Sequence, residues 1–577
     1  MPAASSNTLV SLSAAGTLVE ILRERAARQA GDRVYTFLHG DEQHSLTYEQ
    51  LDRLARSTAA SLLQRCIPGD RVLMIYPPGL DYVVALFACM YAGVIAVPSY
   101  APRPNRPLSR LEAIVANAEP TIVLTTRGLL DSPKSIFHQT EGPLASLPRL
   151  ATDDLAADSS VELPLETISA DTPVILQYTS GSTAFPKGVT LTHGNLVHNT
   201  AAIQRNFPLD TTSSTVFWLP PYHDMGLIGG ILQPLCTGFP VTLLSPVAFL
   251  QRPARWLQAI SEFRATCSGG PNFAYDLCVR RVSEEEIDQL DLSCWKVAFN
   301  GAEPIRKQTL DDFCNKFERC GFQRSSFHPC YGLAESTLMA TGMDREGTGL
   351  VFQTVSRTAL ERNQIEAAMA VADESLLVSS GHAAGGQDVR IVDPVSAEPL
   401  AANRVGEVWI AGPSVAAGYW GRPKETEETF RARLASGEGP FLRTGDLGFL
   451  RDGQLYITGR IKDLIIIRGQ NHYPHDLEFT AQRCHPALQP ASGAAFSVDR
   501  NGAERLILVQ EVDARLDPPT REEITTRISS SITESHELHV DEIILVKPFT
   551  LPRTTSGKMQ RYLCRTAYLT GTLQTLG

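Results

Sequence analysis

Through the first half of the chain, apolar runs typical of buried strands alternate with runs whose apolar residues recur at helical spacing. Residues 47–60 begin with a threonine suited to cap a helix and carry apolar residues at helical spacing. A buried strand is predicted at 70–76 and a helix at 81–92. Further runs of the same two kinds occur at 93–99, 108–117, 121–126, 215–220, 241–246, 265–270 and 296–301. Strands that alternate with helices predict a doubly wound α/β fold, whose ligands gather at the carboxyl ends of the strands.

The pattern changes twice toward the C-terminus. From Val389 the apolar runs are short and punctuated by turns, which predicts a β-rich subdomain over about 389–459. After Gly459, apolar strands separated by helical stretches predict a small α+β domain. We therefore expect a large N-terminal domain at 1–460 and a small mobile C-terminal domain at 461–577.

Composition is that of a globular protein with more than one domain. The 577 residues exceed what one hydrophobic core usually supports, and 43% apolar and 20% charged residues are ordinary values. A net charge of −11 argues against a nucleic-acid-binding protein, which normally carries a basic field. The 11 cysteines are odd in number and never spaced C-x-x-C, so neither a zinc site nor a disulfide framework is expected. A reducing cytoplasm is the simplest compartment.

Neither a secretory signal nor a membrane anchor is expected. Residues 1–16 lack the basic and apolar regions that export requires. The apolar stretch 82–97 is shorter than the roughly 20 residues of a membrane span, and it is interpreted as a buried helix followed by a buried strand. The polar, proline-rich segment 131–171 is expected to be a surface connection.

The strongest candidate for nucleotide binding is the stretch 178–189, YTSGSTAFPKGV. Glycine lets the backbone approach an anion, N–H groups in such a turn form a nest for phosphate oxygens, and Lys187 adds a positive charge. The hydroxyl-bearing and glycine residues are Thr179, Ser180, Gly181, Ser182 and Thr183. A solvated Ser/Gly turn is the alternative. The lysine does not follow glycine at the Walker A spacing, which disfavours a P-loop ATPase.

Together with this loop, six later segments resemble the fatty acyl-AMP ligases, a branch of the adenylate-forming (acyl-CoA synthetase-like) superfamily. The segments are PPYHDMGLIGG (220–230), NGAEP (300–304), CYGLAEST (330–337), RTGD (443–446), GRIKD (459–463) and PRTTSGKMQR (552–561). The resemblance spans nearly the whole chain. The wider superfamily usually carries glycine where Ala184 or Phe185 stands, but this branch tolerates other residues there.

The resemblance implies a two-step activity with ATP and Mg²⁺. A medium- or long-chain fatty acid is activated to an acyl-adenylate with release of pyrophosphate. The acyl group then passes to the phosphopantetheine thiol of an acyl carrier protein, in lipid, polyketide or lipopeptide biosynthesis. The branch also carries an extra segment that impedes the closure needed for coenzyme A chemistry, which we place within about 343–386.

Roles for individual residues follow from the same resemblance. Lys558, which in isolation would be read as a solvated lysine of a Ser/Gly loop, contacts the α-phosphate and the substrate carboxylate. His223 is a donor at the mouth of an apolar channel. Lys462 is the pivot about which the C-terminal domain rotates.

The nucleotide site implied by the resemblance combines a flat wall with polar contacts. The resemblance implies that Asp446 accepts hydrogen bonds from the ribose hydroxyls and that Arg460 also contacts the ribose. Without the resemblance, Asp446 would be interpreted as a group that caps the backbone of a turn. Glu335 binds magnesium, which prefers carboxylate and phosphate oxygens. The adenine wall comprises Asn300, Gly301, Ala302, Glu303, Tyr331 and Gly332. For Glu303, contact with the metal and contact with the adenine amino group both remain open.

The expected acyl pocket lies along the residues that flank His223. Its candidate walls are Trp218, Met225, Ile228, Ile231 and Phe273. For Phe273 and its neighbour Tyr275, packing in a helix core accounts for the sequence equally well.

Rival functions share most of these residues. A fatty acyl-CoA synthetase uses the same first step, whereas a non-catalytic acyl-nucleotide-binding protein would not need Lys558 and Glu335. A loading module of a polyketide or peptide synthetase would have to act in trans, because no carrier segment follows Lys558 in this sequence. Arg553, Arg561 and Arg565 are a candidate landing site for an acidic carrier protein, or they are simply solvated.

Overall fold

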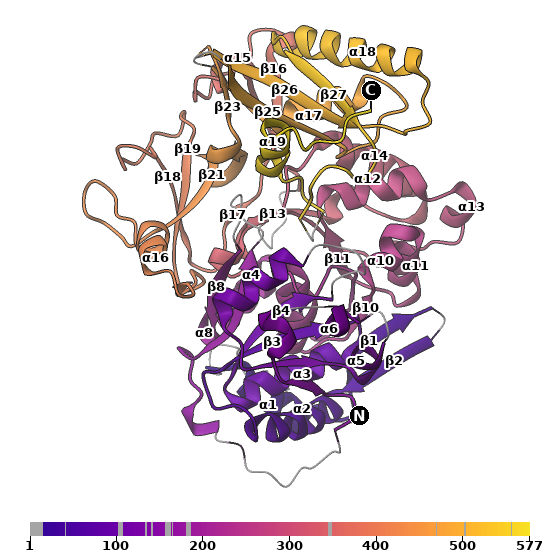
Figure 1. The fold of residues 1–577 in the computed structure, drawn as a ribbon, viewed down its shortest axis with the longest axis vertical. Coiled ribbons are helices and arrows are strands. Elements are labelled where there is room, and N and C mark those ends of the chain that lie inside the picture. Colours follow the sequence, from indigo (N-terminus) through magenta and orange to yellow (C-terminus); the bar gives the residue numbers. More distant parts are fainter. Residues whose placement is uncertain are drawn as a thin grey trace, which may run out of the picture.

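A computed structural model gives the fold (Figure 1). It describes residues 16–40, 42–101, 108–132, 135–139, 142–155, 163, 165–179, 186–343, 349–468, 470–500, 503–554 and 557–576. The elements follow the chain from the N-terminal part at the bottom of Figure 1 to the C-terminal elements at the top.

Two large, mostly parallel sheets form the N-terminal part, which confirms the doubly wound α/β prediction. In spatial order, the nine-stranded sheet contains β17 (His382–Ala383), β14 (Met339–Gly342), β13 (Phe327–Gly332), β12 (Val297–Asn300), β11 (Cys267–Gly270), β9 (Thr215–Phe217), β10 (Val241–Leu244), β1 (Arg33–His39) and β2 (Glu42–Thr47). The seven-stranded sheet contains β20 (Gly418–Tyr419), β8 (Lys187–Thr192), β7 (Pro173–Thr179), β4 (Ile95–Tyr100), β3 (Arg71–Tyr76), β5 (Ile122–Thr125) and β6 (Arg149–Ala151).

Some helices of this part begin at capping residues that the sequence makes recognisable. Thr47 caps the helix after it, because its hydroxyl accepts the Gln50 N–H at 3.2 Å while the Gln50 side chain accepts the Thr47 N–H. The helices are α1 (Leu18–Arg28), α2 (Tyr48–Leu63), α3 (Leu80–Ala92), α4 (Ser109–Ala118), α5 (Arg127–Asp131), α6 (Ile136–Gln139), α7 (Pro143–Ser146), α8 (His193–Asn206), α9 (Gln233–Thr237), α10 (Pro246–Gln251), α11 (Ala254–Glu262), α12 (Asn272–Arg281), α13 (Glu284–Ile287), α14 (Lys307–Phe317), α15 (Arg357–Leu360) and α16 (Pro423–Phe430).

The prediction that 131–171 is only a surface connection is wrong. Strand β6 within it pairs in parallel with β5 and extends the seven-stranded sheet. Leu150 of β6 is buried, and so is Leu144 of α7. The strand is three residues long, too short to produce a recognisable alternation of apolar and polar positions.

Two smaller sheets follow, in the regions where the sequence indicates short β strands and then strands mixed with helices. An antiparallel four-stranded sheet contains β18 (Asp388–Val392), β19 (Gly406–Ala411), β21 (Leu442–Arg451) and β22 (Gln454–Arg460), and it lies at the side of the molecule in Figure 1. At the top, a three-stranded sheet contains β25 (Gly493–Arg500), β26 (Ala503–Glu511) and β27 (Glu542–Val546). It packs with α17 (Pro474–Arg483), α18 (Pro518–His536) and α19 (Arg561–Leu569).

Two antiparallel strand pairs accompany these sheets. They are β15 (Phe352–Ser356) with β16 (Glu374–Val378), and β23 (Ile465–Ile467) with β24 (Gln470–His472). The first pair lies in the segment where we place the extra segment of the branch.

Separate apolar cores stabilise the two ends of the molecule. One core under the nine-stranded sheet is rich in aromatic side chains and includes Trp256, Trp295 and Tyr275. The C-terminal elements have cores of their own, built from residues at Ile465 and beyond. A smaller apolar cluster, which includes Val355, Phe449 and Tyr473, joins the C-terminal elements to the rest of the protein.

A π-helix, η2 (Met225–Leu232), needs glycine for close packing. A Cβ atom on Gly226 would lie 2.0 Å from the carbonyl oxygen of Pro220. A Cβ atom on Gly230 would lie 2.7 Å from the Phe217 ring. The glycines of this segment thus bring the helix against the end of β9, where the cavity described below begins.

Replacing Gly226 with alanine should destabilise the protein by at least about 1–3 kcal/mol, because the backbone must move to relieve the clash. Urea unfolding measures the change. Gly128→Ala in α5 is the matched control: no atom lies within 4 Å of its Cβ position, so it should leave stability unchanged or raise it slightly. Equal stabilities for Gly226→Ala and the parent would contradict the close packing of η2.

Candidate active site

A cavity of about 2490 Å³ opens at the carboxyl ends of β9, β11, β12 and β13. Residues from the four-stranded sheet and from the C-terminal elements close its other side. The predicted residues among those that line it are Thr179, Lys187, Trp218, His223, Met225, Phe273, Ala302, Glu303, Tyr331, Gly332, Glu335, Asp446, Arg460, Lys462 and Lys558. Residues far apart in the sequence thus meet at one site, as the strand order predicts.

Asp446 is held by two partners in the cavity wall. Its carboxylate accepts the Tyr331 hydroxyl at 2.7 Å and the Arg460 Nε–H at 2.8 Å. Asp446 and Arg460 face each other as register partners on β21 and β22. Asp446 is only 4% exposed, and the attraction between its charge and Arg460 raises the pKa of that guanidinium. The burial of Tyr331, together with Asp446, raises the pKa of its hydroxyl, so the tyrosine remains a donor.

The wall beside Tyr331 has a shape that only small residues allow. A Cβ atom on Gly332 would overlap the Leu338 carbonyl oxygen at 1.6 Å. Ala302 has φ of 69°, a left-handed conformation that non-glycine residues rarely adopt. Strain of this kind is concentrated at functional sites. A flat, close backbone surface of this kind suits a planar ring.

Lys187 lies directly opposite Thr179 in the β7–β8 hairpin. It forms an ion pair with Glu425, and its ammonium lies 4.7 Å from the centre of the Tyr419 ring. The Tyr419 hydroxyl in turn donates to Glu335 Oε1 at 2.8 Å. Burial raises the pKa of Glu335. The other loop candidates, Ser180, Gly181, Ser182 and Thr183, lie outside the described residues.

The apolar side of the cavity lies beside His223, two residues before η2. Met225, Gly226 and Gly229 of η2 line it. Trp218 packs on Phe249 with ring centres 3.9 Å apart and meets Phe273 edge-on. Deeper walls are aromatic: Phe207, Phe217, Phe239 and Phe299. An apolar chamber therefore adjoins the polar one.

Four predicted residues lie behind the cavity wall instead of on it. Ile228 and Ile231 of η2 are buried in the core. Asn300 is fully buried, and its amide donates to Asn272 at 3.4 Å. Gly301 lets the Cys330 carbonyl oxygen approach, since a Cβ atom there would lie 2.8 Å from it. These residues support the side chains and backbone that line the cavity.

For Tyr275 the sequence left both a place in the acyl pocket and packing in a helix core open. In the structure Tyr275 is a core residue. It is fully buried and its hydroxyl donates to the Phe299 carbonyl oxygen at 2.7 Å. Phe273, two residues earlier, lines the cavity.

Lys558 faces the cavity from the C-terminal side. Desolvation and the nearby Arg460 lower its pKa, whereas Asp224, Glu303 and Asp446 act in the opposite direction. Burial raises the pKa of Asp224, and Lys558 and a hydrogen bond from the Met225 N–H oppose that shift. The amino group is therefore influenced both by a positive charge and by carboxylates of the N-terminal part.

Sequence reasoning missed Asp224, Tyr419 and Gln177, all of which line the cavity. Asp224 follows His223 directly, so its carboxylate was a signal within a motif already singled out. Gln177 donates to the Tyr222 carbonyl oxygen at 2.9 Å and so holds the segment before His223. Tyr419 is 84 residues from its partner Glu335 and no local pattern marks it.

Glu303 should make stability depend on pH. Burial raises its pKa from 4.5 to about 7, opposed by the Phe273 N–H that it accepts and by Lys558. Because the unfolded chain ionises first, stability falls as pH rises from about 4.5 to 7. Glu303→Gln keeps an acceptor oxygen but has no ionisable group, so its free energy of unfolding should not fall in this pH range. Between pH 5 and pH 7, urea unfolding should therefore show the stability of the variant rising by about 1–3 kcal/mol relative to that of the parent. A difference that stays constant with pH would contradict the assignment.

Comparison with known proteins places this site in context. Residues 22–420 match the family described as AMP-binding enzyme, and residues 462–577 match the AMP domain of Disco-interacting protein 2-like proteins. The medium-chain-fatty-acid–[acyl-carrier-protein] ligase JamA of Moorena producens is 43% identical, with 96% of each chain covered. The ligase of the same description from Teredinibacter turnerae, TtuA, is 36% identical over 95% of this chain and 93% of its own.

Solved structures agree with this relationship. The fatty acyl-adenylate ligase of Legionella pneumophila, solved with acyl adenylate and pyrophosphate, is 38% identical, covers 98% of both chains and superposes with a TM-score of 0.76. A structure from a study of fatty acyl-adenylate ligases of E. coli and L. pneumophila is 34% identical over 97% of this chain and 98% of that chain, with a TM-score of 0.86. The chain belongs to the AMP-binding enzyme family, in its fatty acyl-AMP ligase branch.

Proposed function

We propose that this protein activates a medium- or long-chain fatty acid with ATP and transfers the acyl group to an acyl carrier protein. One observation carries the proposal: a single cavity joins the polar wall of Tyr331, Asp446 and Arg460 to an aromatic chamber. Lys558 and His223 line the same cavity. The names of the relatives, which are ligases of medium-chain fatty acids and carrier proteins, support the choice of both substrates.

In the first step, an oxygen of the fatty carboxylate attacks the α-phosphorus of ATP and pyrophosphate leaves. No general base is required, because a carboxylate is ionised at neutral pH. Asp446 and Arg460 hold the ribose, and Tyr331 lies against the adenine. Lys558 neutralises negative charge on the transferring phosphate and the carboxylate, so positioning and electrostatic stabilisation account for most of the rate.

Glu335 is the residue that would hold Mg²⁺. Among the described residues, no cluster of three His, Cys, Asp or Glu side chains is arranged to hold a metal ion. Magnesium bound with a nucleotide fits this donor set, since it commonly takes one or two carboxylates and completes its shell with phosphate oxygens and water. The ion would offset charge on the phosphates.

In the second step, the phosphopantetheine thiol attacks the acyl carbonyl, a thioester forms and AMP leaves. We propose that Lys462, exposed in the short 3-10 helix η7 (Ile461–Asp463), is the pivot that lets the C-terminal elements turn between the steps. The division into domains near Arg460–Asp463 belongs to the same proposal. In support of this division, two apolar cores of the C-terminal elements are built from buried residues at Ile465 and beyond.

We assign the extra segment of the branch to residues near α15. Its Glu361 carbonyl oxygen accepts the Asn471 N–H at 3.0 Å, and Asn363 accepts the Asn471 side-chain amide at 3.2 Å. Arg357 donates to the carbonyl oxygen of Ser535 in α18. These contacts restrain the C-terminal elements, which supports a preference for a carrier protein over free coenzyme A.

The three arginines considered as a landing site are already paired. Arg553 bonds to Glu511 at 3.0 Å, Arg561 to Glu478 at 2.7 Å, and Arg565 donates to the Ser497 carbonyl oxygen at 2.9 Å. These internal partners favour a structural role for the three side chains over a landing site for a carrier protein.

We place the reaction in the cytoplasm. All eleven cysteines are free, and most are buried, as expected in a reducing compartment. None of the helices in the described part of the chain is long and apolar enough to cross a membrane.

Lys558→Ala should lower adenylate formation by orders of magnitude while ATP binding stays nearly unchanged, because the lysine acts on the transition state. Pyrophosphate release with decanoic acid measures the first effect and calorimetric titration with ATP the second. Lys547→Ala is the control, since Lys547 is exposed and does not line the cavity. Near-normal pyrophosphate release by Lys558→Ala would contradict the proposed role.

The choice of acceptor separates this proposal from an acyl-CoA synthetase. With ATP and decanoic acid, the enzyme should form acyl-carrier thioester when a phosphopantetheinylated carrier is supplied, and little acyl-CoA when coenzyme A replaces it. Mass spectrometry of both products measures the ratio. Acyl-CoA as the main product would favour the synthetase instead, and bound but unreacted ATP would favour a non-catalytic binding protein.

A further inference from the structure

Arg306 bridges the adenine wall and the C-terminal elements. It follows Glu303 by three residues and immediately precedes α14. Its backbone N–H donates to the side chain of Asn272 at 3.1 Å, and Asn272 is buried at the start of α12. The base of the Arg306 side chain is thus fixed within the N-terminal part of the protein.

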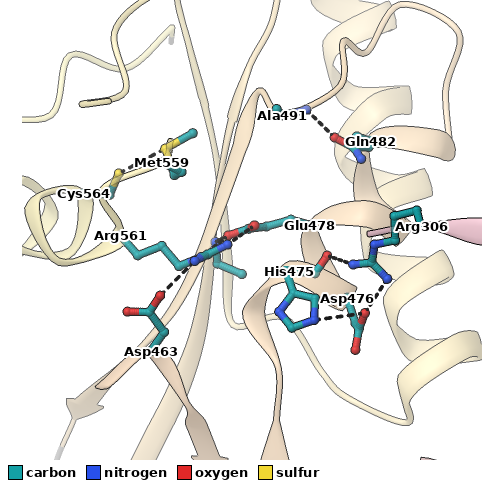
Figure 2. A network of polar contacts seen from close by, with 11 residues as sticks. Arg306, Asp463, His475, Asp476, Glu478, Gln482, Ala491, Met559, Arg561 and Cys564 are labelled. Atoms are coloured by element: carbon teal, nitrogen blue, oxygen red, sulfur yellow. Dashed lines mark hydrogen bonds and ion pairs between the residues drawn. The ribbon is translucent and has the colours of Figure 1, made fainter. Parts of the chain in front are cut away.

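The guanidinium of Arg306 reaches across to α17 (Figure 2). Nη1 donates to Asp476 Oδ1 at 2.8 Å, and Nη2 donates to the His475 carbonyl oxygen at 3.0 Å. The same group lies 4.7 Å from the centre of the Phe479 ring. Burial works against the ionisation of Asp476, but His475 and Arg306 together lower its pKa to about 2. Three contacts of different kinds therefore join one arginine to a single helix.

Helix α17 is connected in turn to the segment that carries Lys558. Glu478 of α17 receives two hydrogen bonds from Arg561, each of 2.7 Å, and Figure 2 shows Arg561 between Glu478 and Asp463. Asp463 of η7 accepts the third bond, at 2.9 Å. Arg561 lies three residues after Lys558, at the first position of α19. Fork-shaped pairs of this kind fix geometry as well as charge.

The two sets of contacts differ in what a rotation would do to them. Glu478 and Arg561 both belong to the C-terminal elements and would turn together. Arg306 and Asp476 lie on opposite sides of Lys462, so a turn about that residue must separate them.

We propose that Arg306 is a positioning residue for the first half-reaction: through α17 and Arg561 it holds Lys558 at the nucleotide site, and its release precedes acyl transfer. The inference rests on the proposed function and on the pivot at Lys462. It adds a residue-level contact that is separate from the contacts made by the segment around α15.

Two half-reaction assays test the role of Arg306. Arg306→Ala should lower the rate of pyrophosphate release from ATP and decanoic acid about tenfold, the equivalent of one charge-assisted hydrogen bond. The KM for ATP should change little. Transfer from preformed decanoyl-adenylate to a carrier thiol should be as fast as in the parent or faster. Arg306→Lys should recover part of the rate, because it keeps the charge beside Asp476 and loses the bond to the His475 carbonyl.

Matched variants separate positioning from a loss of folding. Asp476→Asn should act in the same direction, and the double variant should be little slower than either single one, because both remove the same contact. Arg319→Ala removes an exposed ion pair of the N-terminal part and should change neither half-reaction. Equal losses in both half-reactions, or no loss in either, would overturn the proposal.

A measurement without substrates distinguishes this inference from the proposed function. Lys462 and Arg468 are exposed near the pivot, so trypsin should cut there several-fold faster in Arg306→Ala than in the parent, at a temperature well below the unfolding midpoints of both proteins. Equal cleavage rates would contradict the positioning role. A parent enzyme that forms no adenylate with any fatty acid would instead contradict the proposed function, whatever the trypsin result.

Discussion

The buried carboxylate of Asp446 is the group on which the arrangement of the site depends. A charge that is only 4% exposed is costly unless it is paired and hydrogen-bonded. Its two partners, Tyr331 and Arg460, come from the nine-stranded sheet and from the last strand of the four-stranded sheet. Satisfying this one carboxylate therefore places the β-rich part against the large sheet and places Arg460 at the start of the proposed pivot.

Paired charges also determine where the C-terminal elements sit. Two apolar cores are their own, and Tyr473 shares a further small apolar cluster with residues that precede the proposed pivot. Polar contacts also cross to the N-terminal part: Arg306 with Asp476, Arg357 with Ser535, and Asn471 with residues near α15. Polar contacts with partial exposure can be exchanged for water at modest cost, unlike an apolar core. An interface of this composition suits a body that has to occupy two orientations in one catalytic cycle.

Local pattern was enough to predict much of this molecule. The helix after Thr47 and the strand at 70–76 could be read because capping residues and apolar spacing act within a few residues. The cavity at the carboxyl ends of the strands followed from the order of those elements. Asp446 and Arg460 were found through motifs, and their pairing reflects the hairpin between β21 and β22.

What the sequence did not reveal depends on distant parts of the chain. Strand β6 is too short to show a pattern and exists because β5 offers it an edge. Ile228 and Ile231 could not be separated from Met225, since the side of η2 that faces the cavity is set by packing. Lys187 pairs with Glu425, and Arg561 with Glu478, across separations that no spacing rule covers. These pairs arise only once the fold has brought the elements together.

The central claim is that one cavity joins a nucleotide and a fatty acyl chain into a single product. Native mass spectrometry of the full chain with ATP, Mg²⁺ and decanoic acid tests it most directly. The account predicts one decanoyl-adenylate bound per protein, with pyrophosphate released, that persists until a carrier thiol is added. Formation of ADP, or release of AMP with no bound acyl-adenylate, would contradict it.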